Sequence, residues 1–268
     1  MKLDVRVSLR EWLATCFGFR GRKKLNSGYY AACAGLQAQS QALELVANNL
    51  ANVNTTGYRA QQALFRSLLA DSVAGSADPL NRAVNNFNVL GDSRTDLSAG
   101  NLERTGNTLD LAIEGTGFFV IQTQAGTLYT RNGNFQVSPN GRLITPAGDL
   151  VLGEQGPITI PAGAISISPD GTLSVDGAVA DKLRLVEFAP GSAPLAAGKA
   201  YYSVPQADVR LAADSYVRQG MLESSNVNSV AAVVDLITIQ RRAEMLERAM
   251  SAFQSNLDRI AANDLPHV

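Results

Sequence analysis

The chain has 268 residues, a formal net charge of −1 at pH 7 and 46% hydrophobic residues. This length allows one large domain or two smaller ones, and the near-neutral charge excludes the broad basic surface of a nucleic-acid-binding protein. The single histidine, His267, lies beside the C-terminus, which excludes a Ser–His–Asp or Cys–His catalytic site in an ordered core and disfavours a zinc site.

Residues 1–24 differ from the rest of the chain because seven basic residues stand there against only two acidic ones, Asp4 and Glu11. The segment starts basic but has no uninterrupted apolar core, so it makes a poor secretory signal. We expect an extension of the folded protein or a start site assigned too early, with a basic amphipathic membrane contact as the alternative.

Apolar residues predict a first long helix from about Ser27 to about Asn54, ended by the Thr55–Gly57 segment. Spacings of four and three residues place several of these apolar residues on one face of the predicted helix. The leucines of this N-terminal heptad face are Leu36, Leu43 and Leu50. A second helical stretch through Leu64 and Leu68 is expected to follow, and residues 71–108, rich in Ala, Ser and Asn, are expected to form a linker.

From Leu109 the period of the apolar residues changes to two, which is typical of strands. Turn sequences then recur, and two of them are nearly identical: Ser-Pro-Asn-Gly-Arg-Leu at 138–143 and Ser-Pro-Asp-Gly-Thr-Leu at 168–173. Proline, then Asn or Asp, then Gly fits a type I turn followed by a left-handed residue. The pattern predicts a compact antiparallel β domain over residues 109–215 with the same hairpin used twice.

A second long helix is predicted near the C-terminus, where spacings of four and three residues run through about four heptads from Ala232. Its C-terminal heptad face contains Leu236, Ile239, Leu246, Met250, Phe253 and Leu257. A second apolar stripe, Val230, Val234 and Ile237, lies off that face and indicates more than one neighbour. Heptad faces at both ends predict that the ends pair with each other or with other copies of the chain.

These elements predict an α+β fold in which long N- and C-terminal coiled-coil-type helices bracket a compact antiparallel all-β domain. The expected divisions are an extension (1–24), an N-terminal helical part (25–70), a linker (71–108), a β-rich outer domain (109–215) and a C-terminal helical part (216–268).

The most specific local motif is Ala47–Arg59, in which asparagine amides can bond neighbouring backbones and a glycine can end a helix. Its distinctive residues are Asn48, Asn49, Asn52, Asn54, Thr56 and Gly57. The motif resembles the N-terminal signature of the bacterial flagellar rod and hook protein family. The chain also resembles other stretches of the family, in the same order, at residues 26–32, 109–119, 129–135, 222–228 and 240–245.

The resemblance implies a structural subunit of the rod that crosses the periplasm in the flagellar basal body, without cofactor or small-molecule substrate. The implied partners are other rod proteins, copies of the chain itself, and the flagellar type III export apparatus, which delivers such proteins without a cleaved signal peptide. The terminal helices would polymerise and transmit torque, with the β domain outside them. The compact β domain suits a rod subunit better than the larger hook protein, and the distal rod subunit is the alternative.

Three other classes of function are weaker. A cell-wall hydrolase could use an acidic pair such as Asp110 and Glu114, but spacing alone does not place two carboxylates across a sugar. Nucleotide binding is disfavoured because Gly115-Thr-Gly117 lacks the third glycine of the dinucleotide fingerprint. A secreted β-rich adhesin with a helical stalk would not need heptad faces at both ends. We therefore predict a self-assembling protein rather than an enzyme.

Overall fold

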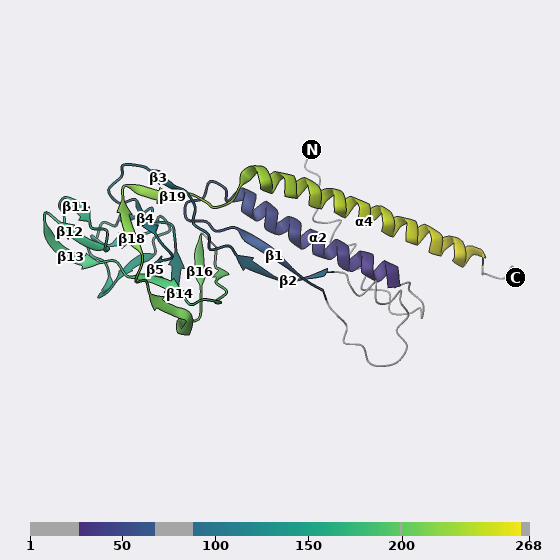
Figure 1. The fold of residues 1–268 in the computed structure, drawn as a ribbon, viewed down its shortest axis with the longest axis horizontal. Helices are drawn as coiled ribbons and strands as arrows, with labels where there is room; N and C mark the ends of the chain where they lie inside the picture. Colours follow the sequence, from purple (N-terminus) through teal and green to yellow (C-terminus); the bar gives the residue numbers. More distant parts are fainter. Residues whose placement is uncertain (1–26, 68–87, 199, 264–268) are drawn as a thin grey trace. The chain divides into compact units, whose positions relative to one another are not determined.

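The computed structural model describes residues 27–67, 88–198 and 200–263, which fall into two compact units (Figure 1). The helical unit contains most of two α-helices, α2 (Ser27–Ala51) and α4 (Ser229–Asn263), and parts of strands β1 (Gln61–Ser67) and β2 (Asn88–Thr95). The β-rich unit consists of residues 45–63 and 93–234. The chain therefore passes between the units four times, after residues 44, 63, 92 and 234.

The β-rich unit holds the remaining strands and one short 3₁₀-helix. In chain order they are β3 (Leu102–Arg104), β4 (Leu111–Glu114), β5 (Phe118–Thr123), β6 (Gly126–Thr130), β7 (Gln136–Val137), β8 (Leu143–Ile144), β9 (Leu150–Gly153), β10 (Gly156–Pro157), β11 (Ile165–Ile167), β12 (Thr172–Val175), β13 (Ala178–Lys182), β14 (Leu185–Phe188), β15 (Leu195–Ala196), β16 (Tyr201–Ser203), η1 (Gln206–Asp208), β17 (Val209–Leu211), β18 (Tyr216–Gln219) and β19 (Met221–Glu223).

The largest sheet has ten strands, of which seven follow the order β15–β16–β6–β5–β9–β8–β7. The other three are β10 on β9, β14 on β5 and β17 on β14. A three-stranded sheet, β11–β12–β13, and the pairs β18–β4 and β19–β3 complete the unit. Strands β3 and β19 are 117 or more residues apart in the chain, since β3 ends at 104 and β19 begins at 221, yet they pair in antiparallel register.

Strand β5 is the centre of the β-rich unit because both of its faces are buried. Successive side chains of a strand point to opposite faces. Phe119 and Ile121 accordingly enter one apolar cluster, and Phe118 and Val120 enter another. In the second cluster the rings of Phe118 and Phe188 stack at 4.3 Å between centroids. A strand covered on both faces gives the neighbouring residues a rigid support.

The repeated hairpin sequence forms the same turn twice, as predicted. The N–H of Gly141 donates to the carbonyl of Ser138 at 2.8 Å, and the N–H of Gly171 donates to that of Ser168 at 2.9 Å. Both glycines have positive φ, +73° and +83°, which side chains with a Cβ rarely adopt. The turns connect β7 to β8 and β11 to β12.

The predicted α+β class with long coiled-coil-type helices bracketing an all-β domain is wrong. The described residues contain two α-helices against nineteen strands, so the protein is mainly β. A coiled coil on the predicted heptad face would bury its leucines along the length of the helix. In α2 the buried positions are Gly35, Ala38, Ala42 and Asn49, whereas the predicted Leu36 and Leu43 are only half-buried. The heptad spacing identified amphipathic helices, and that spacing alone does not define a coiled coil.

Strand β1 also differs from the sequence-based expectation, which was a second helix through Leu64. Ala63 and Phe65, two residues apart, fit the period of a strand as well as Leu64 and Leu68, four residues apart, fit that of a helix, and a stretch this short does not separate the two. Residues 68–87 lie outside the described residues. In the described part of the chain, no helix is sufficiently long and apolar to cross a membrane.

Candidate functional site

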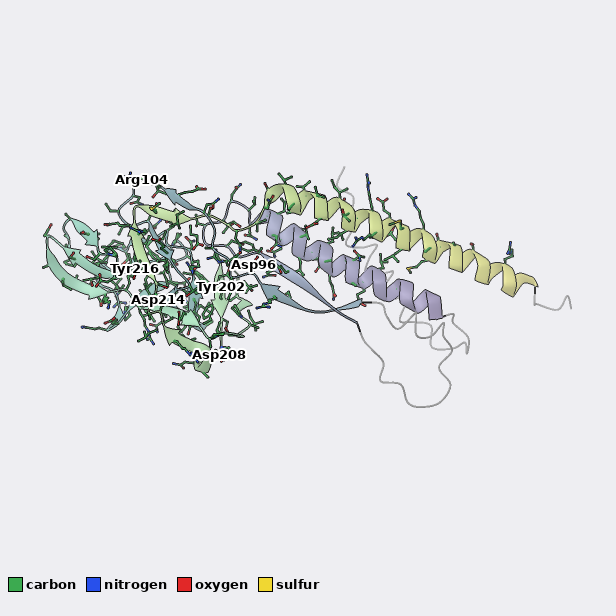
Figure 2. The ribbon with its side chains drawn as sticks, in the orientation of Figure 1. Asp96, Arg104, Tyr202, Asp208, Asp214 and Tyr216 are labelled. Carbon is green, nitrogen blue, oxygen red and sulfur yellow. The ribbon has the colours of Figure 1, made fainter. Side chains whose placement is uncertain are left out.

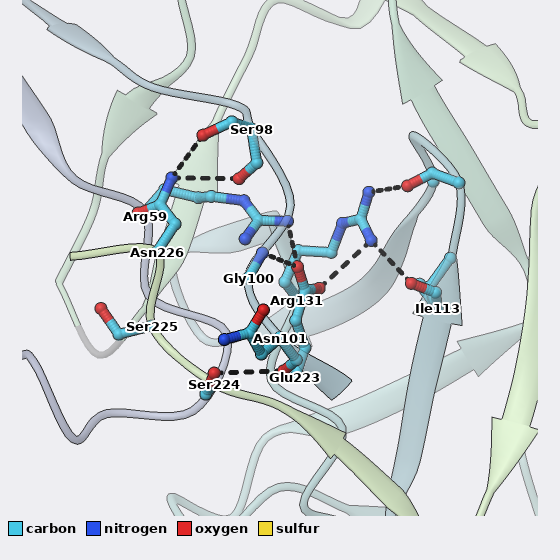
Figure 3. Close-up of polar contacts among 12 residues, drawn as sticks. Arg59, Ser98, Gly100, Asn101, Ile113, Arg131, Glu223, Ser224, Ser225 and Asn226 are labelled. Atoms are coloured by element: carbon cyan, nitrogen blue, oxygen red, sulfur yellow. Dashed lines mark hydrogen bonds and ion pairs between the residues drawn. The ribbon is translucent and has the colours of Figure 1, made fainter. Parts of the chain in front are cut away.

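Three charged side chains meet inside the β-rich unit, and we call them the Arg59–Glu223–Arg131 junction. Nη2 of Arg59 lies 2.6 Å from Oε1 of Glu223, and Nη1 of Arg131 lies 3.2 Å from Oε2 of the same carboxylate. All three side chains are at most 1% exposed. Figure 3 shows the two guanidinium groups approaching the carboxylate from different sides.

Arg131 directly follows β6, and further contacts fix its side chain. Its Nη1 also donates to the carbonyl of Ile113 at 3.0 Å, and its Nη2 donates to the carbonyl of Gly115. The guanidinium carbon lies 4.9 Å from the centre of the Phe118 ring, within the range of a cation–π contact. Arg131 is therefore held by the well-packed strands β4 and β5.

The junction carries two positive charges and one negative charge, so Glu223 is its critical member. Burial lowers the pKa of Arg131 to about 10, the Glu223 carboxylate opposes this shift, and the Arg59 charge adds to it. Nε and Nη1 of Arg59 and Nε of Arg131 are buried and have no hydrogen-bond partner among the described residues. Removing one partner of a buried ion pair leaves an uncompensated charge, which is strongly destabilising.

The carboxylate of Glu223 also bonds the segment that precedes β3, since the N–H of Gly100 donates to its Oε1 at 2.8 Å. The carbonyl of Glu223 accepts the N–H of Gly57 at 2.8 Å. The N–H of Arg59 donates to Oη of Tyr202 at 2.8 Å, and burial raises the pKa of that hydroxyl to about 12. Figure 2 labels Tyr202 within the β-rich unit. Glu223 thus bonds backbone and side-chain groups from three other segments, those of Gly57 and Arg59, of Gly100 and of Arg131.

The predicted signature residues surround this junction. Gly57 has φ +68°, and a Cβ on it would lie 2.2 Å from the backbone nitrogen of Asn132, so only glycine fits. Oγ1 of Thr56 donates to Oδ1 of Asn132 at 2.8 Å. Oδ1 of Asn49 accepts the N–H of Gln61 at 2.9 Å, and its Nδ2 donates to the Gln61 carbonyl at 2.8 Å. The loop after α2 is therefore defined by side chains of its own motif.

The other three asparagines of the signature lie farther out. Nδ2 of Asn52 donates to the carbonyl of Asn48 at 2.8 Å and to Oδ1 of Asn48 at 2.9 Å. Asn48 and Asn54 are exposed. Oη of Tyr58 links the two groups of asparagines because it lies 3.1 Å from Oδ1 of Asn48 and 3.0 Å from Oδ1 of Asn49.

The residues predicted for assembly are spread along the two helices. Met250 is fully buried, and the other described members of the two heptad faces are half-buried: Leu36, Leu43, Leu50, Leu236, Ile239 and Leu246. Phe253 and Leu257 belong to α4, but their side chains lie outside the described ones.

The acidic pair considered for cell-wall hydrolysis is divided between two environments. Asp110 is buried, and its Oδ1 accepts a hydrogen bond from Asn107 at 3.1 Å. Glu114 is exposed and forms an ion pair with Arg218 at 2.7 Å. Among the described residues, no group of three His, Cys, Asp or Glu side chains could hold a metal ion.

The sequence-based prediction did not select Arg59, Arg131 or Glu223, although all three stand in motifs that it singled out. Each is the one charged residue of its motif: Arg59 in 47–59, Arg131 in 129–135 and Glu223 in 222–228. A single charged residue in an otherwise uncharged motif indicates a candidate buried ion pair. Charged side chains are buried only where an opposite charge or hydrogen bonds compensate for the lost hydration.

Replacing Glu223 by Gln should destabilise the β-rich unit by about 3–5 kcal/mol, because both guanidinium groups would lose their counter-charge. The matched control is Glu114→Gln, which breaks the exposed pair with Arg218. That change should cost at most about 1 kcal/mol. Urea unfolding measures the free energy of unfolding of both variants. Equal losses of stability would show that the buried junction contributes no more than the exposed pair.

Replacing Gly57 by Ala should cost more than replacing Gly106, whose φ is +78° but whose Cβ would meet nothing within 4 Å. The left-handed conformation costs about 1–2 kcal/mol in each variant. Overpacking against the backbone of Asn132 should add about 1–3 kcal/mol in the Gly57→Ala variant alone. Thermal unfolding of the two variants gives the comparison, and equal stability would contradict the close approach.

We expect Tyr202 to make the protein less stable at alkaline pH. The pKa of Tyr202 is raised in the folded protein, so its contribution to the free energy of unfolding is complete below about pH 10 and is lost as pH rises toward 12. The loss attributable to this group should approach about 1.4 kcal/mol per pH unit. Urea unfolding between pH 9 and pH 12 should therefore give a shallower decline for Tyr202→Phe than for the wild type, and parallel curves would contradict the assignment.

Comparisons with known proteins place the three motifs in one family. Residues 30–59 match the family model described as "Flagella basal body rod protein". Residues 112–175 match "Flagellar hook protein FlgE/F/G D1 domain", and residues 218–263 match "Flagellar basal body rod FlgEFG protein C-terminal". Each matched region supplies one member of the junction: Arg59, Arg131 and Glu223.

Curated relatives match over most of their length. The flagellar basal-body rod protein FlgG of Agrobacterium fabrum is 34% identical over 246 residues, which covers 82% of this chain and 92% of the relative. FlgF of Caulobacter vibrioides is 32% identical over 240 residues, covering 84% and 93%, and FlgF of Rhizobium meliloti is 31% identical over 243 residues, covering 88% and 96%. The predicted resemblance is confirmed: the chain belongs to the flagellar basal-body rod protein family and is a structural subunit of the rod.

Proposed function

We propose that this rod subunit polymerises through its terminal helices and thereby transmits torque across the periplasm. The observation that carries the proposal is the apolar surface that α4 leaves exposed. Val230 is 73% exposed, Val234 56% and Ile237 45%. They are spaced four and three residues apart and so share one face of the helix. A contiguous apolar face of this kind is typical of a surface that another molecule covers.

The half-buried heptad residues support the same proposal. Leu236, Ile239 and Leu246 keep part of their apolar surface accessible in the isolated chain. With the stripe of Val230, Val234 and Ile237, α4 offers two apolar faces, which suits contact with more than one neighbour. Copies of this chain and other rod proteins are the proposed neighbours, and family membership supports both.

Two further parts of the proposal rest on family membership alone. The first is delivery by the flagellar type III export apparatus without a cleaved signal peptide. The second is a location in the periplasm-spanning rod of the basal body. Relatives are named as basal-body rod proteins, which supports the location directly and the delivery route indirectly.

Within the family we propose a role like that of FlgF, with the distal rod protein FlgG as the alternative. Relatives of both names match over similar lengths, so overall identity does not separate them. The Arg241–Arg242 pair before Ala-Glu-Met and the ending Asp-Leu-Pro-His-Val favour FlgF. Cross-linking in isolated basal bodies would distinguish the two by the neighbours that each position in the rod has.

Replacing Leu246 by Glu should abolish assembly while the β-rich unit stays folded, because a charge on the C-terminal heptad face opposes its burial against a neighbour. The control is Val179→Glu on β13, where the side chain is 72% exposed. Swimming of complemented cells and the subunit content of isolated basal bodies report assembly, and urea unfolding reports the fold. Normal swimming with Leu246→Glu would refute this role of the heptad face.

A further inference from the structure

Asn226 lies three residues before α4, and its side-chain amide joins three segments that are far apart in the sequence. Its Oδ1 accepts the N–H of Ala60 at 2.7 Å. Its Nδ2 lies 3.1 Å from the carbonyl oxygen of Asp96 and 3.0 Å from that of Ser98. The contacts to Ser98 are drawn in Figure 3. All of these residues belong to the β-rich unit.

The segments that Asn226 joins are those from which the chain leaves the β-rich unit. Ala60 directly precedes β1, which passes out after residue 63, and Asp96 directly follows β2, which returns after residue 92. Asn226 itself precedes the exit after residue 234 along α4. The segments at 60, 96 and 226 are thus the bases of three of the four passages between the units.

The backbone at these bases is only partly paired without the Asn226 side chain. The carbonyl of Ala60 accepts the N–H of Asp96 at 2.8 Å, which joins the bases of β1 and β2. Two bonds join the base of α4 to this pair: the backbone N–H of Asn226 donates to the carbonyl of Tyr58 at 3.4 Å, and the N–H of Ala60 donates to Oδ1 of Asn226. An amide suits this position because it presents one acceptor oxygen and two N–H donors on a short side chain.

We propose that Asn226 is a positioning residue that makes the bases of β1, β2 and α4 open and close together. Force applied to α4 then reaches the β-rich unit through three connected segments rather than through the segment before α4 alone. This mechanical consequence rests on the proposed function of torque transmission, whereas the coupled opening is a property of the single chain.

Hydrogen exchange of the purified full-length protein tests the coupling directly. In Asn226→Ala, amides in residues 58–62 and 93–98 should exchange about tenfold faster than in the wild type, by a common factor, while amides of β5 keep their protection. Asn226→Asp should give the same result, because a carboxylate keeps the acceptor but cannot donate to the carbonyls of Asp96 and Ser98.

The matched control is Asn228→Ala, two residues along the chain. Oδ1 of Asn228 accepts the N–H of Ala231 at 3.0 Å, so this change removes a cap of α4 without touching the other two segments. Exchange should then rise only in the first turn of α4. The proposal is overturned if Asn226→Ala changes only residues 224–230, or if the segments at 58–62 and 93–98 change by unrelated factors.

The exchange experiment needs no assembled rod, so it separates the two claims. Independent opening of the three segments would end the coupling proposal whatever the chain does in the cell. Failure of the rod function would appear in the assembly assay of the Leu246 variant and would leave the exchange result unaffected.

Discussion

Glu223 is the shared counter-charge of two buried guanidinium groups, and the meeting of three distant chain segments depends on that one carboxylate. Taking a charge out of water is costly unless an opposite charge and hydrogen bonds replace the lost hydration. Here Arg59 and Arg131 meet the same carboxylate at 2.6 Å and 3.2 Å, and all three side chains are at most 1% exposed. The signature loop, the end of β6 and strand β19 are therefore constrained by one shared electrostatic requirement.

The two arginines differ in how they are held. Arg131 follows β6, next to the doubly covered strand β5, and the carbonyls of Ile113 and Gly115 orient its guanidinium group. Arg59 lies in an irregular segment between α2 and β1. That segment takes its course from the positive φ of Gly57 and from Asn49. The β-rich unit thus provides a rigid support on which the N-terminal signature is assembled.

Local patterns allowed the β-rich part of the fold to be predicted from sequence. The period of two from Leu109 and the two Ser-Pro-Asn/Asp-Gly turns depend on neighbouring residues only, and both appear in the structure as predicted. The burial of α2 was not predictable in this way. Its most buried stripe consists of Gly35, Ala38 and Ala42, and the larger leucines beside it dominated the heptad pattern.

The candidate site was predictable only in part because its central contacts are long-range. Asn49 and Gly57 stand in the motif that the sequence selected, and the bond of Asn49 to Gln61 and the positive φ of Gly57 are local features. The pairing of Arg59 with Glu223 joins residues 164 positions apart, and that of Arg131 with Glu223 joins residues 92 positions apart. No spacing rule reaches that far. For a subunit of the rod, such contacts let the two ends of the chain share one folded support.

A double-mutant cycle between Arg59→Met and Arg131→Met tests the shared carboxylate most directly. With one arginine removed, the other still neutralises Glu223, whereas removal of both leaves a buried carboxylate without a counter-charge. The account predicts that the double variant loses more stability in urea unfolding than the two single variants together, by at least about 1 kcal/mol. Additive losses would contradict it, because they would mean that the two arginines do not depend on the same glutamate.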